Sequence, residues 1–317
     1  MGEKILLDCD PGHDDALAIL LAAGDPRSEL LAITTVAGNQ TIDKVTHNAR
    51  AVCTVAGVSG VPIARGAAAP LVREAIIAPD YHGESGLDGP ALPEPTVPLD
   101  PRAAAELIVE TVLAHEPGTV TLVPTGPLTN IALALALEPR LAERVKGVSL
   151  MGGSYTRGNR TPAAEFNILA DPEAAAAVFA ADWPVTMVGL DLTHQALADD
   201  AFRGRVRELG TPLAGFVEDL LGFFTTAYAR RGFPAPAVHD LCAVAAVLDP
   251  GVLTYREAFV TVELAGRWTT GMTVTDFDGL LGRPVNTRVA VSLDRDRLWD
   301  MAVAALERLG RPAPAAG

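Results

Sequence analysis

Cysteine is scarce in this chain, which contains only three among its 317 residues. Cys9, Cys53 and Cys242 each lie in an apolar stretch. An odd number of cysteines in a chain of this length argues against a disulfide framework and for buried free thiols. Because free thiols persist in reducing compartments, we expect a cytoplasmic protein.

Positive charge and long apolar runs are also in short supply. The chain has 25 Lys and Arg residues against 39 Asp and Glu residues, which gives a formal net charge of −14. A surface that binds nucleic acid needs a basic patch, so we expect no nucleic-acid partner. Gly, Pro or a charged residue interrupts every apolar run before it reaches membrane-spanning length, so we expect no membrane partner. The chain also begins directly with a strand pattern, which predicts no signal peptide.

Hydrophobic residues make up 49% of the chain, enough for a sizeable core. Apolar segments of strand length alternate with longer helical patterns, which indicates a parallel sheet covered by helices. The predicted strands span residues 4–9, 30–36, 119–124, 146–151 and 184–190. The predicted helices span residues 14–24, 41–56, 101–115, 127–138 and 171–181. We therefore predict an α/β fold with an open, mostly parallel sheet and helices on both faces, as a single domain over residues 1–310 with a disordered tail at 311–317.

Two Asp-Pro pairs predict helix starts, because Asp is a favoured N-cap and Pro a favoured first helical residue. These pairs are Asp100-Pro101 and Asp171-Pro172. Residues 196–231 predict two helices packed outside the sheet and broken at Gly210-Thr211-Pro212. The last part of the chain predicts strands that form a hairpin or an added sheet edge, at residues 258–264, 268–275 and 286–293.

Four aspartates lie within the first fifteen residues, at the point where the first strand turns into a helix. They are Asp8, Asp10, Asp14 and Asp15. Open α/β sheets bind their ligands at the carboxyl ends of strands. So many like charges in one turn need a cation, and Ca²⁺ and Mg²⁺ prefer oxygen ligands. Complementing the helix dipole explains Asp14 and Asp15 only, so the cluster predicts a metal-binding or catalytic site.

Further polar and glycine-containing segments follow the other predicted strands. Since the carboxyl ends of parallel strands share one edge of the sheet, we expect these segments to meet there. They are Gly38-Asn39, Pro124-Thr125-Gly126-Pro127, Met151-Gly152-Gly153, Asn159 and Glu165-Phe166-Asn167. His239-Asp240 opens an apolar helix that runs to Leu248, and this pair is a second candidate site. His82-Gly83-Glu84, in a glycine-rich loop, is a third.

Several other site types can be compared with the spacing of the first aspartates. A calcium-binding EF-hand loop starting at Asp8 requires Gly at its sixth position, but Gly12 is fifth. No dinucleotide-binding or P-loop glycine pattern follows a predicted strand. A haloacid-dehalogenase-like Mg²⁺ phosphohydrolase also has Asp-x-Asp after its first strand, which would make Asp8 a nucleophile, although Gly12 departs from its pattern. A non-catalytic protein that binds Ca²⁺ and ribose is another alternative.

The pattern of these motifs resembles the nucleoside hydrolases, the inosine-uridine-preferring nucleoside N-ribohydrolases. The resemblance runs through most of the chain in matching order. It is carried by Asp8-x-Asp10-Pro11-Gly12-x-Asp14-Asp15, Val36-Ala37-Gly38-Asn39-Gln40-Thr41, Pro124-Thr125-Gly126-Pro127-Leu128-Thr129-Asn130, Met151-Gly152-Gly153, Glu165-Phe166-Asn167 and Val238-His239-Asp240.

This resemblance implies Ca²⁺-dependent hydrolysis of the N-glycosidic bond of ribonucleosides, by a homo-oligomer that is a dimer or a tetramer. The implied metal ligands are Asp10, Asp15, the carbonyl of Thr125, and Asp240. Asp10 is also the implied general base for a Ca²⁺-bound water, and His239 acts on the leaving base. The implied substrate-binding residues are Asp14, Asn39, His82, Met151, Asn159, Glu165, Phe166, Asn167 and Tyr228. The base preference, and which of Phe223, Phe224, Tyr228 and Arg231 contact the base, stay open.

Overall fold

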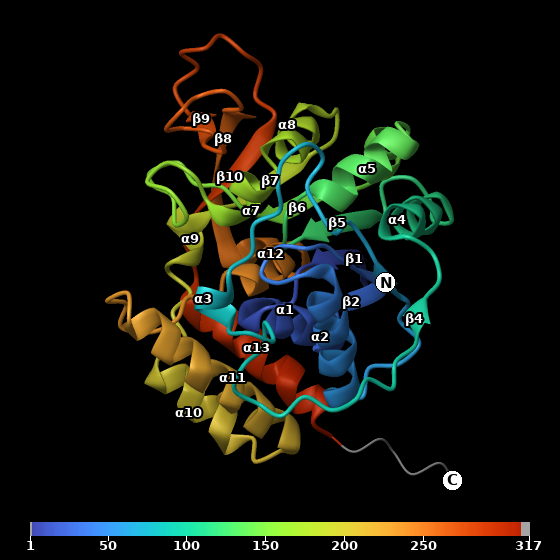
Figure 1. Cartoon of the computed structure of the whole chain (residues 1–317), viewed down its shortest axis with the longest axis vertical. Helices are drawn as coiled ribbons and strands as arrows, with labels where there is room; N and C mark the ends of the chain where they lie inside the picture. Colours follow the sequence, from blue (N-terminus) through green and yellow to red (C-terminus); the bar gives the residue numbers. More distant parts are fainter. Residues whose placement is uncertain (1, 312–317) are drawn as a thin grey trace.

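A sheet of ten strands forms the centre of the computed structural model, which describes residues 2–311 (Figure 1). Its strand order is β4-β3-β2-β1-β5-β6-β7-β10-β8-β9. The strands from β4 to β10 in this order are parallel, whereas β8 is antiparallel to β10 and β9 is antiparallel to β8. The strands are β1 (Glu3–Cys9), β2 (Ser28–Thr35), β3 (Ile63–Arg65), β4 (Leu99–Asp100), β5 (Val120–Pro124), β6 (Gly147–Met151), β7 (Val185–Val188), β8 (Leu253–Val262), β9 (Thr273–Asp276) and β10 (Thr287–Leu293).

Helices cover both faces of this sheet (Figure 1). One face is covered by α1 (His13–Gly24), α2 (Ile42–Val55), α10 (Asp200–Glu208), α11 (Pro212–Ala229), α12 (His239–Leu248) and α13 (Arg295–Leu309). The other face is covered by α4 (Ala104–Leu113), α5 (Thr129–Leu137) and α8 (Pro172–Ala180). Shorter helices are α3 (Pro79–His82), α6 (Leu141–Arg144), α7 (Phe166–Ala170), α9 (Leu190–Thr193) and the 3₁₀ turn η1 (Pro250–Val252).

The protein has two hydrophobic cores, one on each face of the sheet, because successive side chains of a strand point to opposite faces. In β1, Ile5 and Leu7 join the core beneath α1, whereas Leu6 joins the core beneath α4 and α5. Both faces of the central strands are therefore apolar, which explains their unbroken Val, Ile and Leu sequences. None of the helices within residues 2–311 combines the length and apolar character that a membrane crossing requires.

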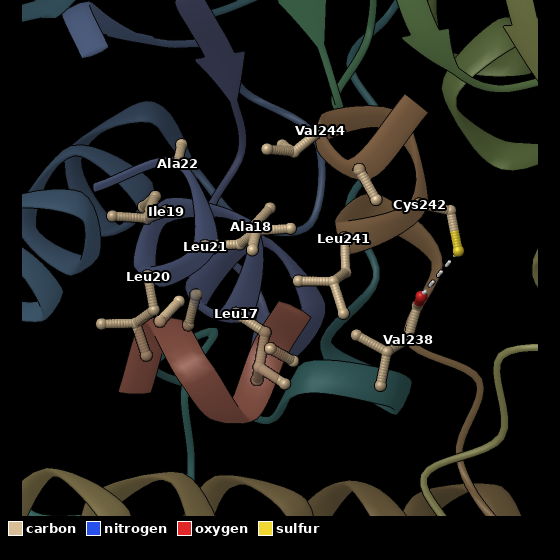
Figure 2. Packing of buried hydrophobic residues seen from close by; sticks show 14 of the residues in the cluster. Leu17, Ala18, Ile19, Leu20, Leu21, Ala22, Val238, Leu241, Cys242 and Val244 are labelled. Carbon is tan, nitrogen blue, oxygen red and sulfur yellow. Dashed lines mark hydrogen bonds between the residues drawn. The ribbon is translucent and has the colours of Figure 1, made fainter. Parts of the chain in front are cut away.

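Helix α1 is buried on almost all sides and packs against α12 and α13 (Figure 2). Leu17 and Leu21 of α1 and Leu241 and Val244 of α12 belong to the same core. Burying one leucine contributes roughly 1.5–3 kcal/mol, so this contact holds the two helices firmly together. Because both helices begin at the same edge of the sheet, their packing sets the separation of the acidic residues at their N-termini.

The predicted architecture is confirmed, with differences at its periphery. Helix α8 begins at Pro172 with Asp171 as its N-cap, as predicted, and α12 spans His239–Leu248. The predicted helix start at Asp100-Pro101 is wrong: Asp100 ends β4, and the N-cap of α4 is Ala103. The predicted strand at 268–275 is also wrong in its first half, where residues 267–271 form a turn.

Besides the short helices α3, α6, α7, α9 and η1, three elements were not predicted from the sequence. Strands β3 and β4 are only three and two residues long, too short to show a period. Helix α13 has an N-cap, Asp294, whose side chain accepts a hydrogen bond from the backbone N–H of Arg297. This signal and the amphipathic pattern that follows it could have identified α13. The predicted tail at 311–317 lies, apart from Arg311, outside the described residues.

Candidate active site

The sheet reverses its strand order at β1, which has β2 on one side and β5 on the other. Such a switch point opens a crevice at the carboxyl ends of the strands. The segment after β1 brings Asp10, Asp14 and Asp15 to this crevice, and the turn after β5 brings Thr125. The N-terminus of α12 brings Asp240 to the same place, although 225 residues separate it from Asp15 in the sequence.

Three carboxylates form the centre of this crevice. Asp14, Asp15 and Asp240 each have an oxygen within 4.8 Å of the others, and all three are buried. Asp10 adjoins them, since its charge raises the pKa of Asp240. Asp14, which the family resemblance assigns to ribose, therefore lies within the acidic cluster itself.

Asp15 is held by several donors. Its Oδ1 accepts hydrogen bonds from Thr125 Oγ1 at 2.8 Å and from the backbone N–H of Asp10 at 3.3 Å. Its Oδ2 accepts hydrogen bonds from the backbone N–H of Gly12 at 3.0 Å and from Asn39 Nδ2 at 3.1 Å. These bonds fix the orientation of a carboxylate that is 0% exposed.

Asp10 has one satisfied oxygen and one free one. Its Oδ2 accepts a 2.6 Å hydrogen bond from the backbone N–H of Asn39. Its Oδ1 is buried and has no hydrogen-bond partner among residues 2–311. The backbones of Gly38 and Gly126 enclose this carboxylate so closely that a Cβ there would lie 2.1 Å from Oδ2 and 2.6 Å from Oδ1 respectively. A buried carboxylate oxygen without a donor is costly unless it meets a proton or a cation.

Burial raises the pKa values of the carboxyl groups in this cluster. Desolvation is the largest cause that raises the pKa of Asp14 to about 7 and the pKa of Asp10 and Asp240 well above the usual range. The charge of Asp15 raises all three pKa values further. An adjacent cation lowers the pKa of a carboxyl group, so this cluster is suited to binding one.

Asp8 lies behind the cluster. Its Oδ1 accepts hydrogen bonds from Thr34 Oγ1 at 2.6 Å and from Asn130 Nδ2 at 2.7 Å, and burial raises its pKa to about 7. Asp8 is 0% exposed and does not line the cavity in front of the cluster. Thr34 and Asn130 hold Asp8 behind the cluster, so the arrangement gives no support to the phosphohydrolase alternative, which needs Asp8 as a nucleophile.

A cavity opens in front of the acidic cluster. All nine residues predicted to bind substrate line it, together with Thr125, His239 and Asp240, while Asp10 and Asp15 lie beneath the lining. The lining residues that sequence analysis named are Asp14, Asn39, His82, Thr125, Met151, Asn159, Glu165, Phe166, Asn167, Phe224, Tyr228, His239 and Asp240.

One wall of the cavity presents carboxylate and amide groups. Glu165 is the N-cap of α7, and its side chain accepts hydrogen bonds from the backbone N–H groups of Gly153, Asn167 and Ile168. Asn167 donates through Nδ2 to the carbonyl of Thr125 at 2.7 Å. Burial raises the pKa of Glu165 to about 7. This wall can bind hydroxyl groups, which both donate and accept hydrogen bonds.

The opposite wall is aromatic and carries two histidines. His239 Nδ1 lies 2.6 Å from Thr193 Oγ1, and its Nε2 lies 2.7 Å from the hydroxyl of Tyr228. Burial lowers the pKa of His239 well below its usual value, so the imidazole is neutral at pH 7. Burial likewise lowers the pKa of His82 well below its usual value.

Of the four base-side candidates, Phe224 and Tyr228 line the cavity. Phe223 instead stacks on the ring of His13. Arg231 pairs with Asp80 and lies over the ring of Tyr81, beside the cavity rather than in its lining.

Three lining residues were not predicted from the sequence, namely Ala78, Tyr81 and Arg160. Tyr81 is next to His82 in the sequence, and Arg160 is next to Asn159. This adjacency to predicted site residues could have indicated that Tyr81 and Arg160 line the cavity.

Comparisons with known proteins agree over almost the whole chain. The family described as "Inosine-uridine preferring nucleoside hydrolase" matches residues 5–300. A protein of that description from Leishmania major is 54% identical over 98% of this chain and 100% of its own. A pyrimidine-specific ribonucleoside hydrolase, RihA, from Shewanella woodyi is 47% identical over 98% of this chain and 100% of its own. The solved structure of a purine-preferring ribonucleoside hydrolase from Gardnerella vaginalis superposes with a TM-score of 0.91 at 31% identity, covering 97% of this chain and 99% of the other.

Proposed function

Since the chain belongs to the inosine-uridine preferring nucleoside hydrolase family, a family of ribonucleoside N-glycosidases, we propose that it hydrolyses purine and pyrimidine ribonucleosides to ribose and free base in a Ca²⁺-dependent reaction. The observation that carries the proposal is the buried acidic cluster at the floor of a cavity that has a hydroxyl-binding wall and an aromatic wall. This combination suits a sugar attached to a flat base.

The residues present fit a Ca²⁺ ion. All the candidate donors are oxygens, Asp10 Oδ1 has no partner among the described residues, and burial raises the pKa of every carboxyl group in the cluster. Asp10, Asp15, the Thr125 carbonyl and Asp240 would hold the ion. The Thr125 carbonyl accepts one hydrogen bond, from Asn167, and its second lone pair remains available. Bound Ca²⁺ would neutralise the carboxylates, orient the sugar diol and make a water more acidic.

Cleavage of a ribosyl–nitrogen bond develops positive charge on the sugar and negative charge on the base. In our proposal Asp14, Asn39, Asn159, Glu165 and Asn167 bind the ribose hydroxyls. Their carboxylate and amide oxygens stabilise the positive charge of the sugar. Asp10 acts as the general base, because its unpartnered Oδ1 can accept the proton of the attacking water.

His239 assists the leaving base through Tyr228. Both ring nitrogens of His239 are within hydrogen-bonding distance of hydroxyl groups, so it reaches the base through the Tyr228 hydroxyl rather than directly. When Thr193 donates to Nδ1 and Nε2–H donates to Tyr228, the phenol hydrogen is free to point into the cavity. A neutral chain of three donors can therefore deliver a hydrogen bond to the base as its negative charge grows.

The proposal is tested by release of ribose from inosine and uridine, before and after chelation and after Ca²⁺ is restored. We expect release that Ca²⁺ restores, with the ratio of the two rates giving the base preference. Asp10→Asn should lose roughly 10²–10⁴-fold in turnover, as is typical for loss of a general base. Asp43→Asn, the same change at an exposed acid, is the control. Near-normal turnover of Asp10→Asn would remove Asp10 from the reaction, and binding without turnover would favour a non-catalytic nucleoside-binding protein.

We also propose that the chain is a cytoplasmic homo-oligomer. Exposed apolar side chains gather on the segment around β9, including Trp268 at 76% exposed and Leu280 at 87% exposed, which favours burial against a second copy. Three buried free cysteines fit a reducing compartment. Light scattering of the purified protein measures the number of copies. A monomer at all concentrations would contradict the proposed homo-oligomer.

A further inference from the structure

The loop between β6 and α7 carries a cavity residue, Asn159, on a turn that is bonded mainly to itself. The backbone N–H of Asn159 donates to the carbonyl of Ala164 at 3.2 Å, which shapes the turn. At its far end, the loop is fixed by Glu165, the N-cap of α7. The contacts at its near end, over residues 154–157, therefore help to set how the turn meets the cavity.

The side-chain amide of Asn159 has one satisfied end and one free end. Its Oδ1 accepts a 2.9 Å hydrogen bond from the backbone N–H of Phe166. Its Nδ2 makes no hydrogen bond within residues 2–311, so it is available to a ligand in the cavity. Asn39 and Asn167 bond to proposed metal ligands, whereas Asn159 bonds to none. Since the proposed Ca²⁺ orients the sugar diol, Asn159 is left to bind the 5′-hydroxyl.

The short helix α9 holds the near end of the loop. Asp191 of α9 accepts a 2.7 Å hydrogen bond at Oδ2 from the backbone N–H of Tyr155, and another at Oδ1 from the hydroxyl of Thr156. The next loop residue, Arg157, donates to Nδ1 of His194, directly after α9, at 2.9 Å. A side chain that accepts from two consecutive residues fixes both the position and the direction of the chain that leaves β6.

The same helix also contacts the base side of the cavity. Thr193, two residues after Asp191, lies 2.6 Å from His239 Nδ1. Thr193 is 0% exposed, whereas Asp191 is half-buried. Side chains two residues apart on a helix do not face each other, so these two serve different walls of the cavity. Their effects on the reaction can therefore be separated.

We propose that Asp191 is a positioning residue for the sugar, which holds residues 155 and 156 so that Asn159 can bind the 5′-hydroxyl of the ribonucleoside. The proposal rests on the nucleoside hydrolase function proposed above, and it concerns a residue that does not line the cavity. Misplacing a substrate-binding group by about 1 Å can lower the rate by roughly a hundred-fold, so a contact outside the cavity can control turnover.

Comparison of uridine with 5′-deoxyuridine isolates the hydroxyl in question. In the unmodified protein, loss of this hydroxyl should lower kcat/KM roughly five- to a hundred-fold, the range for leaving a polar partner unsatisfied. In Asp191→Ala, kcat/KM for uridine should fall by most of that factor, whereas 5′-deoxyuridine should change little. Asp191→Asn should restore the difference, because its amide can accept from Tyr155 and donate to the hydroxyl of Thr156. Equal losses on both substrates in Asp191→Ala would indicate a purely structural role and overturn the proposal.

Thr193→Val is the matched comparison, because it removes a hydrogen bond of the same helix on the base side. It should slow uridine and 5′-deoxyuridine equally and affect p-nitrophenyl riboside, whose leaving group needs no donor, far less. Asp191→Ala should slow p-nitrophenyl riboside as much as uridine, since both carry the 5′-hydroxyl. If the two variants give the same pattern, then α9 is disturbed as a whole and the proposal fails.

Amide hydrogen exchange tests the contact without turnover. Asp191→Ala should speed exchange over residues 155–164, and Thr193→Val should not; unchanged exchange in Asp191→Ala would overturn the proposal. Thr156→Val, at an exposed hydroxyl, removes one of the two bonds and should shift exchange and the substrate ratio in the same direction, even if Asp191→Ala fails to fold. Absence of ribose release by the unmodified protein would refute the hydrolase function instead, while exchange would still report on Asp191.

Discussion

Replacing Gly38 by alanine places a methyl group against the carboxylate that we propose as the general base. The added Cβ would lie 2.1 Å from Asp10 Oδ2 and 2.8 Å from Pro127 Cδ, whereas real Cβ contacts essentially never fall below 3.0 Å. The carboxylate or the backbone around Gly38 must therefore move by about 0.9 Å. Asp10 cannot easily yield, because the backbone N–H of Asn39 holds the same oxygen at 2.6 Å.

The cost of this change can be estimated in two ways. Inserting a methyl group into a packed interior typically destabilises a protein by about 1–3 kcal/mol. Displacing a reacting group by about 1 Å can lower the rate by roughly a hundred-fold. We therefore expect Gly38→Ala to fold with lowered thermal stability, to release ribose roughly a hundred times more slowly, and to bind Ca²⁺ more weakly.

Gly215→Ala is the matched control. Gly215 lies in α11 with nothing within 4 Å of the added Cβ, and alanine is favoured over glycine inside a helix by about 0.5–1 kcal/mol. Thermal unfolding, calcium titration and ribose release should be measured on both variants. If Gly38→Ala matches the unmodified protein in all three, the geometry described around Asp10 is incorrect.

Two further predictions concern charge and the leaving base. Burial raises the pKa of Asp8, Asp14 and Glu165 to about 7, above the values of these groups in an unfolded chain. The folded state therefore favours their neutral forms. The stability that these neutral groups contribute is fully present below about pH 4 and should be lost as the pH rises towards 7. Thermal unfolding of the chelated protein between pH 5 and 8 checks this, and Ca²⁺ should reduce the loss; a melting temperature that rises over this range would contradict it. His239→Ala should slow ribose release from inosine and uridine far more than cleavage of p-nitrophenyl riboside, and equal losses on both would assign His239 a different role.

The centre of the fold could be predicted from sequence because its signals are local and strong. Each central strand is an apolar run, and each is followed by a turn with unusual polar residues. The rule that parallel strands end at one edge then brings Asp15 and Thr125 together without any knowledge of distances. Asp240 follows no strand, and only the family resemblance placed it with them. The positions of Asp14 within the acidic cluster and of Phe223 outside the cavity depend on side-chain directions that the rule does not contain.

The periphery could not be predicted in the same way. Asp100 looked like a helix cap, but its carboxylate pairs with Arg102 and its backbone completes the edge strand β4. The contact between His13 and His82 joins a helix start to a loop 69 residues away, and no periodicity in the sequence signals it. Only the packing of the 79–90 segment against α1 and α11 reveals that contact.

The packing of α1 against α12 has a consequence for how this protein can evolve. The carboxylates at the floor of the cavity belong to two helices, α1 and α12, that share one apolar core. A substitution in that core therefore changes the stability of the fold and the positions of these carboxylates together. His82 and Tyr228, on the aromatic wall, are carried instead by α3 and α11, outside that pair of helices. Substitutions on α3 and α11 that keep the Tyr228 hydroxyl in place can therefore reshape the base side of the cavity without moving the carboxylates at its floor.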